Sequence, residues 1–170
     1  WTFAIIQVLS LLFISIFIKP EYCNWLVRFV CRFLTYAALL FPVYNKQKSK
    51  NIPYPCIYVA NHVSFFDLFI SGTILPGNPR GLEMAQHFTY PVYGWFIKRF
   101  GQIPIEAGNS KSIRESLENA ANLLRNRERS ILVMPEGKRT TTGKIGGFKQ
   151  GAFFLAKKSG TPVVPIVFKK

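Results

Sequence analysis

The chain has 170 residues, of which 49% are hydrophobic and 18% are charged, and its 22 basic and 8 acidic residues give a net charge of +14. This length suits one domain with a hydrophobic core, is too short for two full-sized domains, and together with the composition excludes a membrane protein with several spans. The excess of positive charge predicts an anionic partner, such as phospholipid head groups, a phosphorylated substrate or nucleic acid.

Two apolar stretches open the chain. Residues 1–18 contain no charged side chain, and as a helix they would be roughly 27 Å long, at the lower limit for crossing a bilayer. Residues 25–44 are also apolar, but Arg28 and Arg32 share one helical face, and an arginine at the bilayer centre costs about 2.5–3.5 kcal/mol. We therefore predict a membrane-associated helical hairpin at residues 1–44, embedded in one leaflet or combining one span with one interfacial helix. A cleaved signal peptide and a packed soluble hairpin are the alternatives.

A short basic linker, residues 45–52, follows the hairpin and suits an anionic lipid surface. From residue 53 onward, strand and helix signals alternate without an internal repeat. Two capping boxes, at Ser64 and Ser112, predict the first residues of two of the helices. Strands are predicted at 56–60, 81–85, 102–105, 131–134 and 163–168, and helices at 64–75, 91–100, from 112 onward, and at 147–158. This alternation predicts an α/β domain with a mainly parallel sheet flanked by helices.

A histidine and an aspartate follow the first predicted strand. In open parallel sheets, ligands bind beyond the carboxyl ends of the strands, and His62 lies there. Residues five apart on one helix point about 140° away from each other, so His62 meets Asp67 only if it lies in the turn before the helix. Histidine, with an unperturbed pKa of about 6.5, suits a general base, and Asp67 would fix its tautomer. A histidine that merely caps the turn is the alternative.

Further polar residues follow two other predicted strands. Glu106 comes after the strand at 102–105, and Lys138 and Arg139 come after the strand at 131–134. Lysine and arginine side chains suit the binding of phosphate, although a plain surface loop has a similar composition. The sequence lacks a Gly-x-Ser-x-Gly nucleophile motif and a P-loop. A direct attack by a substrate group, without a covalent acyl-enzyme, is therefore the simplest mechanism.

Metal and nucleic acid are not predicted as ligands. His62 and His87 are the only histidines, and none of the three cysteines has metal-ligand spacing. We expect the cysteines to be buried reduced thiols. His87 is predicted to have no acidic residue nearby in the sequence and to be a surface or loop residue. No nucleic-acid-binding motif accompanies the positive charge.

Five segments of the chain carry a resemblance to a known family. The segments are Asn61–Asp67 (NHVSFFD), Gly101–Glu106 (GQIPIE), Met134–Arg139 (MPEGKR), the stretch GGFKQGAFFLA from Gly146, and TPVVPIVF from Thr161. In their order and spacing they resemble the motifs of the glycerolipid acyltransferase family, and within it the 1-acylglycerol-3-phosphate acyltransferases. The resemblance runs from about Pro53 to the end of the chain.

The resemblance implies transfer of an acyl chain from acyl-CoA or acyl-carrier protein to a hydroxyl of a lysophospholipid, with no further cofactor. It implies that His62 is the base and Asp67 its orienting partner. Residues 53–170 would be the acyltransferase domain, C-terminally incomplete, located at a membrane on the cytoplasmic face of the cell inner membrane. The acceptor-binding block implied by the family pattern comprises Glu136, Gly137, Lys138 and Arg139.

Two positions depart from the family pattern. Ala107 stands where the second block usually ends in an arginine thought to hold the acceptor phosphate, and Lys138 stands where threonine is usual. Lys138 could compensate for the lost arginine in binding lysophosphatidate. A different lysophospholipid acceptor, or a non-catalytic lipid-binding module with the same fold, are the alternatives.

Overall fold

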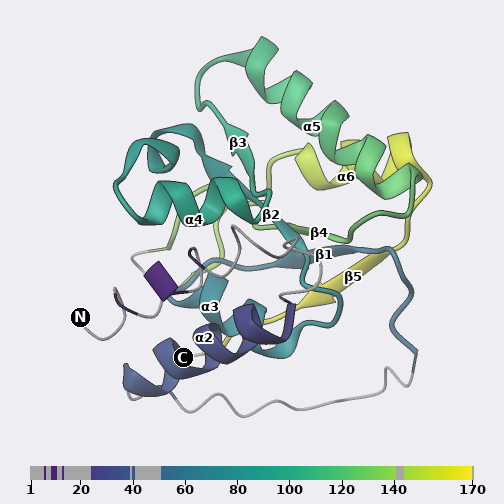
Figure 1. Cartoon of the computed structure of the whole chain (residues 1–170). Coiled ribbons are helices and arrows are strands. Elements are labelled where there is room, and N and C mark those ends of the chain that lie inside the picture. Colours follow the sequence, from purple (N-terminus) through teal and green to yellow (C-terminus); the bar gives the residue numbers. More distant parts are fainter. Residues whose placement is uncertain are drawn as a thin grey trace.

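Figure 1 shows the computed structural model of the chain, which describes residues 6, 9, 10, 13, 24–38, 40, 51–140 and 144–169. Most of the first predicted apolar helix, the lysines of the predicted linker and Cys23 lie outside the described residues. Residues 25–38 and 40 of the second predicted helix and most of the predicted α/β domain lie within them.

The central sheet has five strands, and every neighbouring pair runs parallel. Their order across the sheet is β3-β2-β4-β1-β5 (Figure 1). All five predicted strands are confirmed to within one or two residues, as is the α/β class. The strands are β1 (Ile57–Ala60), β2 (Arg80–Met84), β3 (Ile103–Ile105), β4 (Ile131–Val133) and β5 (Val163–Ile166).

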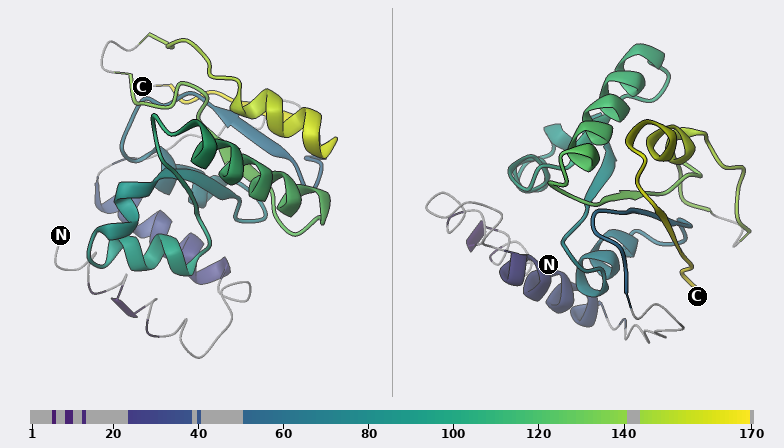
Figure 2. Two further views of the ribbon diagram at one scale, coloured as in Figure 1. Left: turned by 90° about the horizontal axis from the view of Figure 1, so that it is seen from above. Right: turned by 90° about the vertical axis from the view of Figure 1, so that its right-hand side faces the viewer.

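Helices cover both faces of the sheet (Figure 2). α5 (Ser110–Arg125) and α6 (Gly151–Ser159) pack on one face, where Leu117, Leu124 and Leu155 form a core with Ile57 and Ile131. α3 (Asp67–Ile74) packs on the other face, against the alternate side chains of β1. Because successive strand residues point to opposite faces, the apolar run of β1 contributes to both cores.

An additional short helical pair follows β2. The 3-10 helix η2 (Ala85–Thr89), which the sequence pattern did not predict, leads into α4 (Tyr93–Arg99). Phe96 and Ile97 of α4 pack against Val27 and Val30 of α2 (Asn24–Ala37). This third cluster of buried residues connects α2 to the α/β domain.

The close crossing of α2 and α3 also attaches α2 to the α/β domain. A Cβ added at Gly72 would lie 2.7 Å from the sulfur of Cys31, so only glycine permits this approach. Arg28 donates a hydrogen bond of 3.2 Å to the carbonyl oxygen of Thr73. Cys31 and Cys56 are buried and free, as predicted, and burial raises the pKa of Cys31 to about 12. Among the helices described, none has the length and apolar character needed to span a membrane.

The two predicted capping boxes are wrong in detail. α3 begins at Asp67 rather than at Ser64, because Asp67 folds back to bind the preceding turn while the hydroxyl of Ser64 accepts from the N–H of Phe66. α5 begins at Ser110, and its N-cap is Asn109. α6 begins at Gly151 and ends at Gly160, a residue with φ of +66°.

Candidate active site

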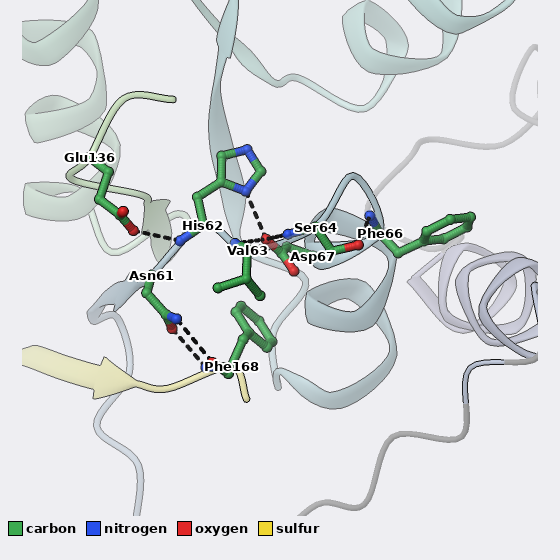
Figure 3. Close-up of polar contacts among 8 residues, drawn as sticks. All are labelled: Asn61, His62, Val63, Ser64, Phe66, Asp67, Glu136 and Phe168. Atoms are coloured by element: carbon green, nitrogen blue, oxygen red, sulfur yellow. Dashed lines mark hydrogen bonds and ion pairs between the residues drawn. The ribbon is translucent and has the colours of Figure 1, made fainter. Parts of the chain in front are cut away.

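The turn between β1 and α3 brings His62 and Asp67 together (Figure 3). Nδ1 of His62 lies 2.7 Å from Oδ2 of Asp67. The main-chain N–H groups of Val63 and Ser64 donate to the same oxygen, each at 2.8 Å. The carboxylate at the first residue of α3 therefore holds both the turn that precedes the helix and the imidazole at the end of that turn.

This hydrogen-bond pattern fixes the orientation of the imidazole. The side chain of Asp67 is 1% exposed, and its Oδ1 has no hydrogen-bond partner among the described residues. An ionised carboxylate can only accept hydrogen bonds, so Nδ1 of His62 carries a proton and donates it. Nε2 is left with its lone pair, and in Figure 3 this nitrogen points away from Asp67. The arrangement suits a general base.

Glu136 fixes the main chain of His62 rather than facing a ligand. It is 6% exposed, and its two carboxylate oxygens accept from the N–H of His62 and the N–H of Gly146, each at 2.8 Å. The N–H of Thr140 donates to the carbonyl oxygen of His62 at 2.9 Å. The loop after β4 is therefore joined to His62 from both sides. Of the predicted acceptor-binding block, Glu136 is the member that does not line the cavity described below.

Asn61 joins the end of β1 to the chain beyond β5. Its amide nitrogen donates to the carbonyl oxygen of Phe168 at 2.9 Å, and its amide oxygen accepts from the N–H of Phe168 at 2.7 Å (Figure 3). The side chain thus pairs with the neighbouring main chain as a strand residue would. The sequence contains Asn61 within the histidine motif but does not reveal this role.

His62 lines a cavity of about 1630 Å³ at the carboxyl edge of the sheet. Its walls come from α2, α3, β2, η2, α4, α5 and the loop after β4. Most of the wall is apolar, including Val30 and Leu34 of α2, Phe69 of α3 and Phe96 of α4. A cavity of this size and composition can hold long hydrocarbon chains beside a reacting polar group.

Cationic side chains lie on the wall formed by the loop after β4. Lys138 and Arg139 both line the cavity, and the Arg139 guanidinium lies 5.8 Å from the ring centroid of Phe65. Lys149, which the sequence analysis did not single out, lines the same wall. Its Nζ would be 2.7 Å from a Cβ placed on Gly137, whose φ is +67°. This loop therefore combines three cations near His62.

The residues predicted after β3 differ in their placement. Glu106 does not line the cavity, and its carboxylate instead accepts from the side chain of Asn109 at 2.9 Å, beside the N-terminus of α5. Ala107 does line the cavity. The position where the family pattern has an arginine therefore faces the cavity without a charge.

A second histidine–carboxylate pair lies in the same cavity. Nδ1 of His87 contacts Oε1 of Glu83, four residues earlier, and both side chains line the wall. The prediction that His87 lacks an acidic neighbour is wrong, because the strand β2 leads directly into η2 and brings the two side chains together. The spacing of four residues was the available signal. Within the described ranges, no group of three or more His, Cys, Asp or Glu side chains is placed to hold a metal ion.

Comparison with known proteins gives consistent matches. The profile of a family described as Acyltransferase matches residues 43–169. The chain is 34% identical over 132 residues to the chloroplastic 1-acyl-sn-glycerol-3-phosphate acyltransferase BAT2 of Brassica napus, covering 75% of this chain and 38% of that protein. It is 30% identical over 115 residues to the 1-acyl-sn-glycerol-3-phosphate acyltransferase of Saccharomyces cerevisiae, covering 66% and 38%. The chain thus spans less than half the length of these relatives.

A solved structure shares the fold. The crystal structure of the 1-acyl-sn-glycerophosphate acyltransferase PlsC from Thermotoga maritima is similar with a TM-score of 0.59 and 22% sequence identity. The similar region covers 94% of this chain and 71% of that one. At this identity the likeness concerns the arrangement of helices and strands.

Proposed function

The chain belongs to the acyltransferase family, and from that premise we propose that it transfers a fatty acyl chain from a thioester donor to the free hydroxyl of 1-acyl-glycerol-3-phosphate, giving phosphatidic acid. The observation that carries the proposal is the His62–Asp67 pair. His62 lines a largely apolar cavity with cations on one wall, and its Nε2 has no hydrogen bond to a described residue. An amphiphile with an anionic head group and a hydrocarbon tail matches both parts of that cavity. The donor would be acyl-CoA or acyl-carrier protein.

His62 would act as the general base. Nε2 takes the proton from the acceptor hydroxyl as its oxygen attacks the thioester carbonyl carbon, and Asp67 stabilises the imidazolium that forms. The tetrahedral intermediate collapses by breaking the carbon–sulfur bond. The thiolate leaves and takes up the proton held on Nε2, which restores the neutral imidazole. A thiol has a pKa of about 8.5, so its departure needs little acid assistance, whereas the attacking hydroxyl needs the base.

The cations of the loop after β4 would bind the acceptor phosphate. Lys138, Arg139 and Lys149 all line the wall next to His62, and guanidinium and ammonium groups form strong charge-assisted hydrogen bonds with phosphate. Ala107 supplies no charge at the place where the family pattern has an arginine. A different lysophospholipid acceptor, with a phosphodiester head group, is therefore the second candidate substrate.

The outer face of α2 supports contact with a lipid surface. Trp25, Phe29 and Tyr36 are exposed there, and their spacing of four and seven residues places them on one side of the helix, together with exposed Arg32. Aromatic and arginine side chains are common at the membrane–water interface. We propose that this face lies against the membrane from which the lysolipid enters the cavity.

A direct assay tests the proposal. The purified chain is incubated with acyl-CoA or acyl-carrier protein and either lysophosphatidate or lysophosphatidylglycerol, and the formation of the diacyl product is measured. We expect turnover of lysophosphatidate that disappears with His62→Gln. Turnover of the phosphodiester alone would reject the acceptor, and turnover unaffected by His62→Gln would reject the base. Lipid binding without turnover of either acceptor would favour a non-catalytic module.

A further inference from the structure

The Glu83–His87 pair reproduces the geometry of the catalytic pair but has no role in the mechanism above. Nδ1 of His87 is bound to the Glu83 carboxylate, and Nε2 has no hydrogen bond to any described residue. The imidazole also lies near two tyrosine rings, with centroids 5.3 Å away for Tyr90 and 6.2 Å away for Tyr93. Burial, and then the charge of Glu83, raise the pKa of the Tyr93 phenol, which therefore stays neutral. The pair is thus a polar group held in place within the cavity wall.

The position of this pair in the sheet relates it to His62. β4 lies between β1 and β2, so the chains that carry the two pairs leave the sheet about two strand spacings, roughly 10 Å, apart. The loop after β4, with Lys138 and Arg139, leaves the sheet between them. His62, which follows β1, and Glu83 and His87, in β2 and η2, line the same cavity as Lys138 and Arg139 of this loop.

The side chains in this part of the cavity favour binding of an anion that carries more than one negative charge. Lys138 and Arg139 supply permanent positive charge, and Glu83 already neutralises His87 in part. A histidine bound to a carboxylate through Nδ1 can donate from Nε2 only as an imidazolium, and a phosphate placed at Nε2 favours that form. A phosphate monoester, with more charge and more free oxygens than a diester, gains most from such a donor.

We propose that His87, positioned by Glu83, binds the phosphate monoester of the lysolipid acceptor and makes this enzyme favour monoester over diester head groups. The inference rests on the proposed function. The phosphates of CoA are a second source of the same chemistry, but the whole pantetheine arm separates them from the thioester. In 1-acyl-glycerol-3-phosphate, by contrast, the reacting hydroxyl and the phosphate are on neighbouring carbons. A phosphate site in the cavity that His62 also lines therefore fits the acceptor.

The test is the kinetics of His87→Gln with lysophosphatidate. We expect the KM for lysophosphatidate to rise about tenfold, as for loss of one charge-assisted hydrogen bond, with kcat and the KM for acyl-CoA changed less than twofold. The KM for lysophosphatidylglycerol should rise less than threefold. His87→Lys restores a cation and should bring the KM for lysophosphatidate back to within threefold, whereas a purely structural role would be impaired by both substitutions. Glu83→Gln keeps an oxygen for Nδ1 and should raise the same KM by about threefold.

Gln86→Ala is the matched control, because Gln86 is exposed on the same 3-10 helix and does not line the cavity. Its kinetics should equal those of the wild type. An unchanged KM for lysophosphatidate in His87→Gln would overturn the proposal. So would a rise confined to the KM for acyl-CoA that vanishes with an acyl-pantetheine donor, which lacks the nucleotide phosphates.

Direct binding separates this inference from the proposed function. Lysophosphatidate binding is measured by calorimetry with His62→Gln, and again with His62→Gln combined with His87→Gln. Tenfold weaker binding in the double variant supports the inference even if the wild type transfers no acyl chain. Equal binding by the two proteins, alongside normal turnover by the wild type, rejects the role of His87 and leaves the proposed function intact.

Discussion

The two histidine–carboxylate pairs of the cavity use the same contact in different surroundings. In each, Nδ1 meets a carboxylate oxygen, Nε2 has no hydrogen bond to a described residue, and the histidine lines the cavity. The Asp67 side chain is 1% exposed and receives two main-chain N–H bonds in addition to the imidazole. The Glu83 side chain is 18% exposed, and His87 is its hydrogen-bond partner among the described residues.

The difference shows how surroundings assign a role to the same pair of groups. The main chain of His62 is held by Glu136 and Thr140, and Asp67 holds its ring and its tautomer. A fixed lone pair at Nε2 suits proton abstraction from a hydroxyl. His87 belongs to a five-residue 3-10 helix with a more exposed carboxylate, which suits binding better than proton transfer. The predictions below compare the two pairs directly.

Exchanging each histidine for glutamine should give the largest difference between the two pairs, and the difference should be in kcat. Glutamine can donate and accept hydrogen bonds but cannot act as a base near neutral pH. His62→Gln should lower kcat for lysophosphatidate about 10²–10⁴-fold, whereas His87→Gln should leave kcat within twofold. Steady-state kinetics with both variants measure this contrast. A kcat loss in His87→Gln equal to that in His62→Gln would remove the distinction between the pairs.

Exchanging each carboxylate for its amide should give the next largest contrast. In Asp67→Asn, the amide oxygen can replace Oδ2 toward its three donors, but the amide lacks the charge that supports the imidazolium. Its NH₂ group would be buried at the position of Oδ1, which makes no hydrogen bond to a described residue. We expect kcat to fall by about a hundredfold or more and the free energy of unfolding to fall by about 1–3 kcal/mol. Glu83→Gln, in the more exposed pair, should lower the free energy of unfolding by less than about 1 kcal/mol. Urea denaturation and kinetics check both values, and equal losses would contradict the comparison.

The difference between the His62–Asp67 and Glu83–His87 pairs also explains which part of the site could be predicted from the sequence. His62 and Asp67 follow a short β-branched strand at a spacing that lets them meet only if His62 lies in the turn before the helix, so the sequence made the contact possible. Glu83 and His87 are also close in sequence, but they lie across the junction of β2 with a 3-10 helix. No periodic pattern marks such a helix, and the pair was missed for that reason.

The fold was more predictable than its long-range contacts. Buried strands such as β4 are continuous apolar runs, and the buried face of α5 follows from the 3.6-residue period. The ends of helices depended on side chains that compete for the same N–H groups, so Asn109 rather than Ser112 caps α5. The contacts of Glu136 and Asn61 cross more than 70 residues of sequence. Local patterns carry no information about partners at that separation.

Glu136 tests whether the rigid main chain of His62 matters. In Glu136→Gln, the N–H of His62 or that of Gly146 would face an amide NH₂ instead of an oxygen of the buried side chain. We expect the free energy of unfolding to fall by about 1–3 kcal/mol and kcat to fall about tenfold, with a smaller effect on the KM for lysophosphatidate. Thermal unfolding and kinetics measure these quantities.

Glu118→Gln is the control for Glu136→Gln. Glu118 is partly exposed and forms a surface ion pair of 2.9 Å with Lys158, for which about 0–1 kcal/mol is typical. The kcat of Glu118→Gln should equal that of the wild type. A stability loss as large as that of Glu136→Gln would mean that the buried hydrogen bonds to His62 contribute little beyond a general charge effect.

Gly137→Ala should have the smallest effect, and it acts on the loop between the two pairs. The φ of +67° costs about 1–2 kcal/mol for alanine, and its Cβ would lie 2.7 Å from Nζ of Lys149. Lys149 must therefore move, and the KM for lysophosphatidate should rise about threefold with kcat unchanged. Gly147→Ala is the control, because its Cβ would meet nothing within 4 Å. If Gly137→Ala lowered kcat instead of raising the KM for lysophosphatidate, the loop would act on the base His62 rather than on the phosphate. That result would contradict the assignment of proton transfer to His62 and of head-group binding to the loop after β4.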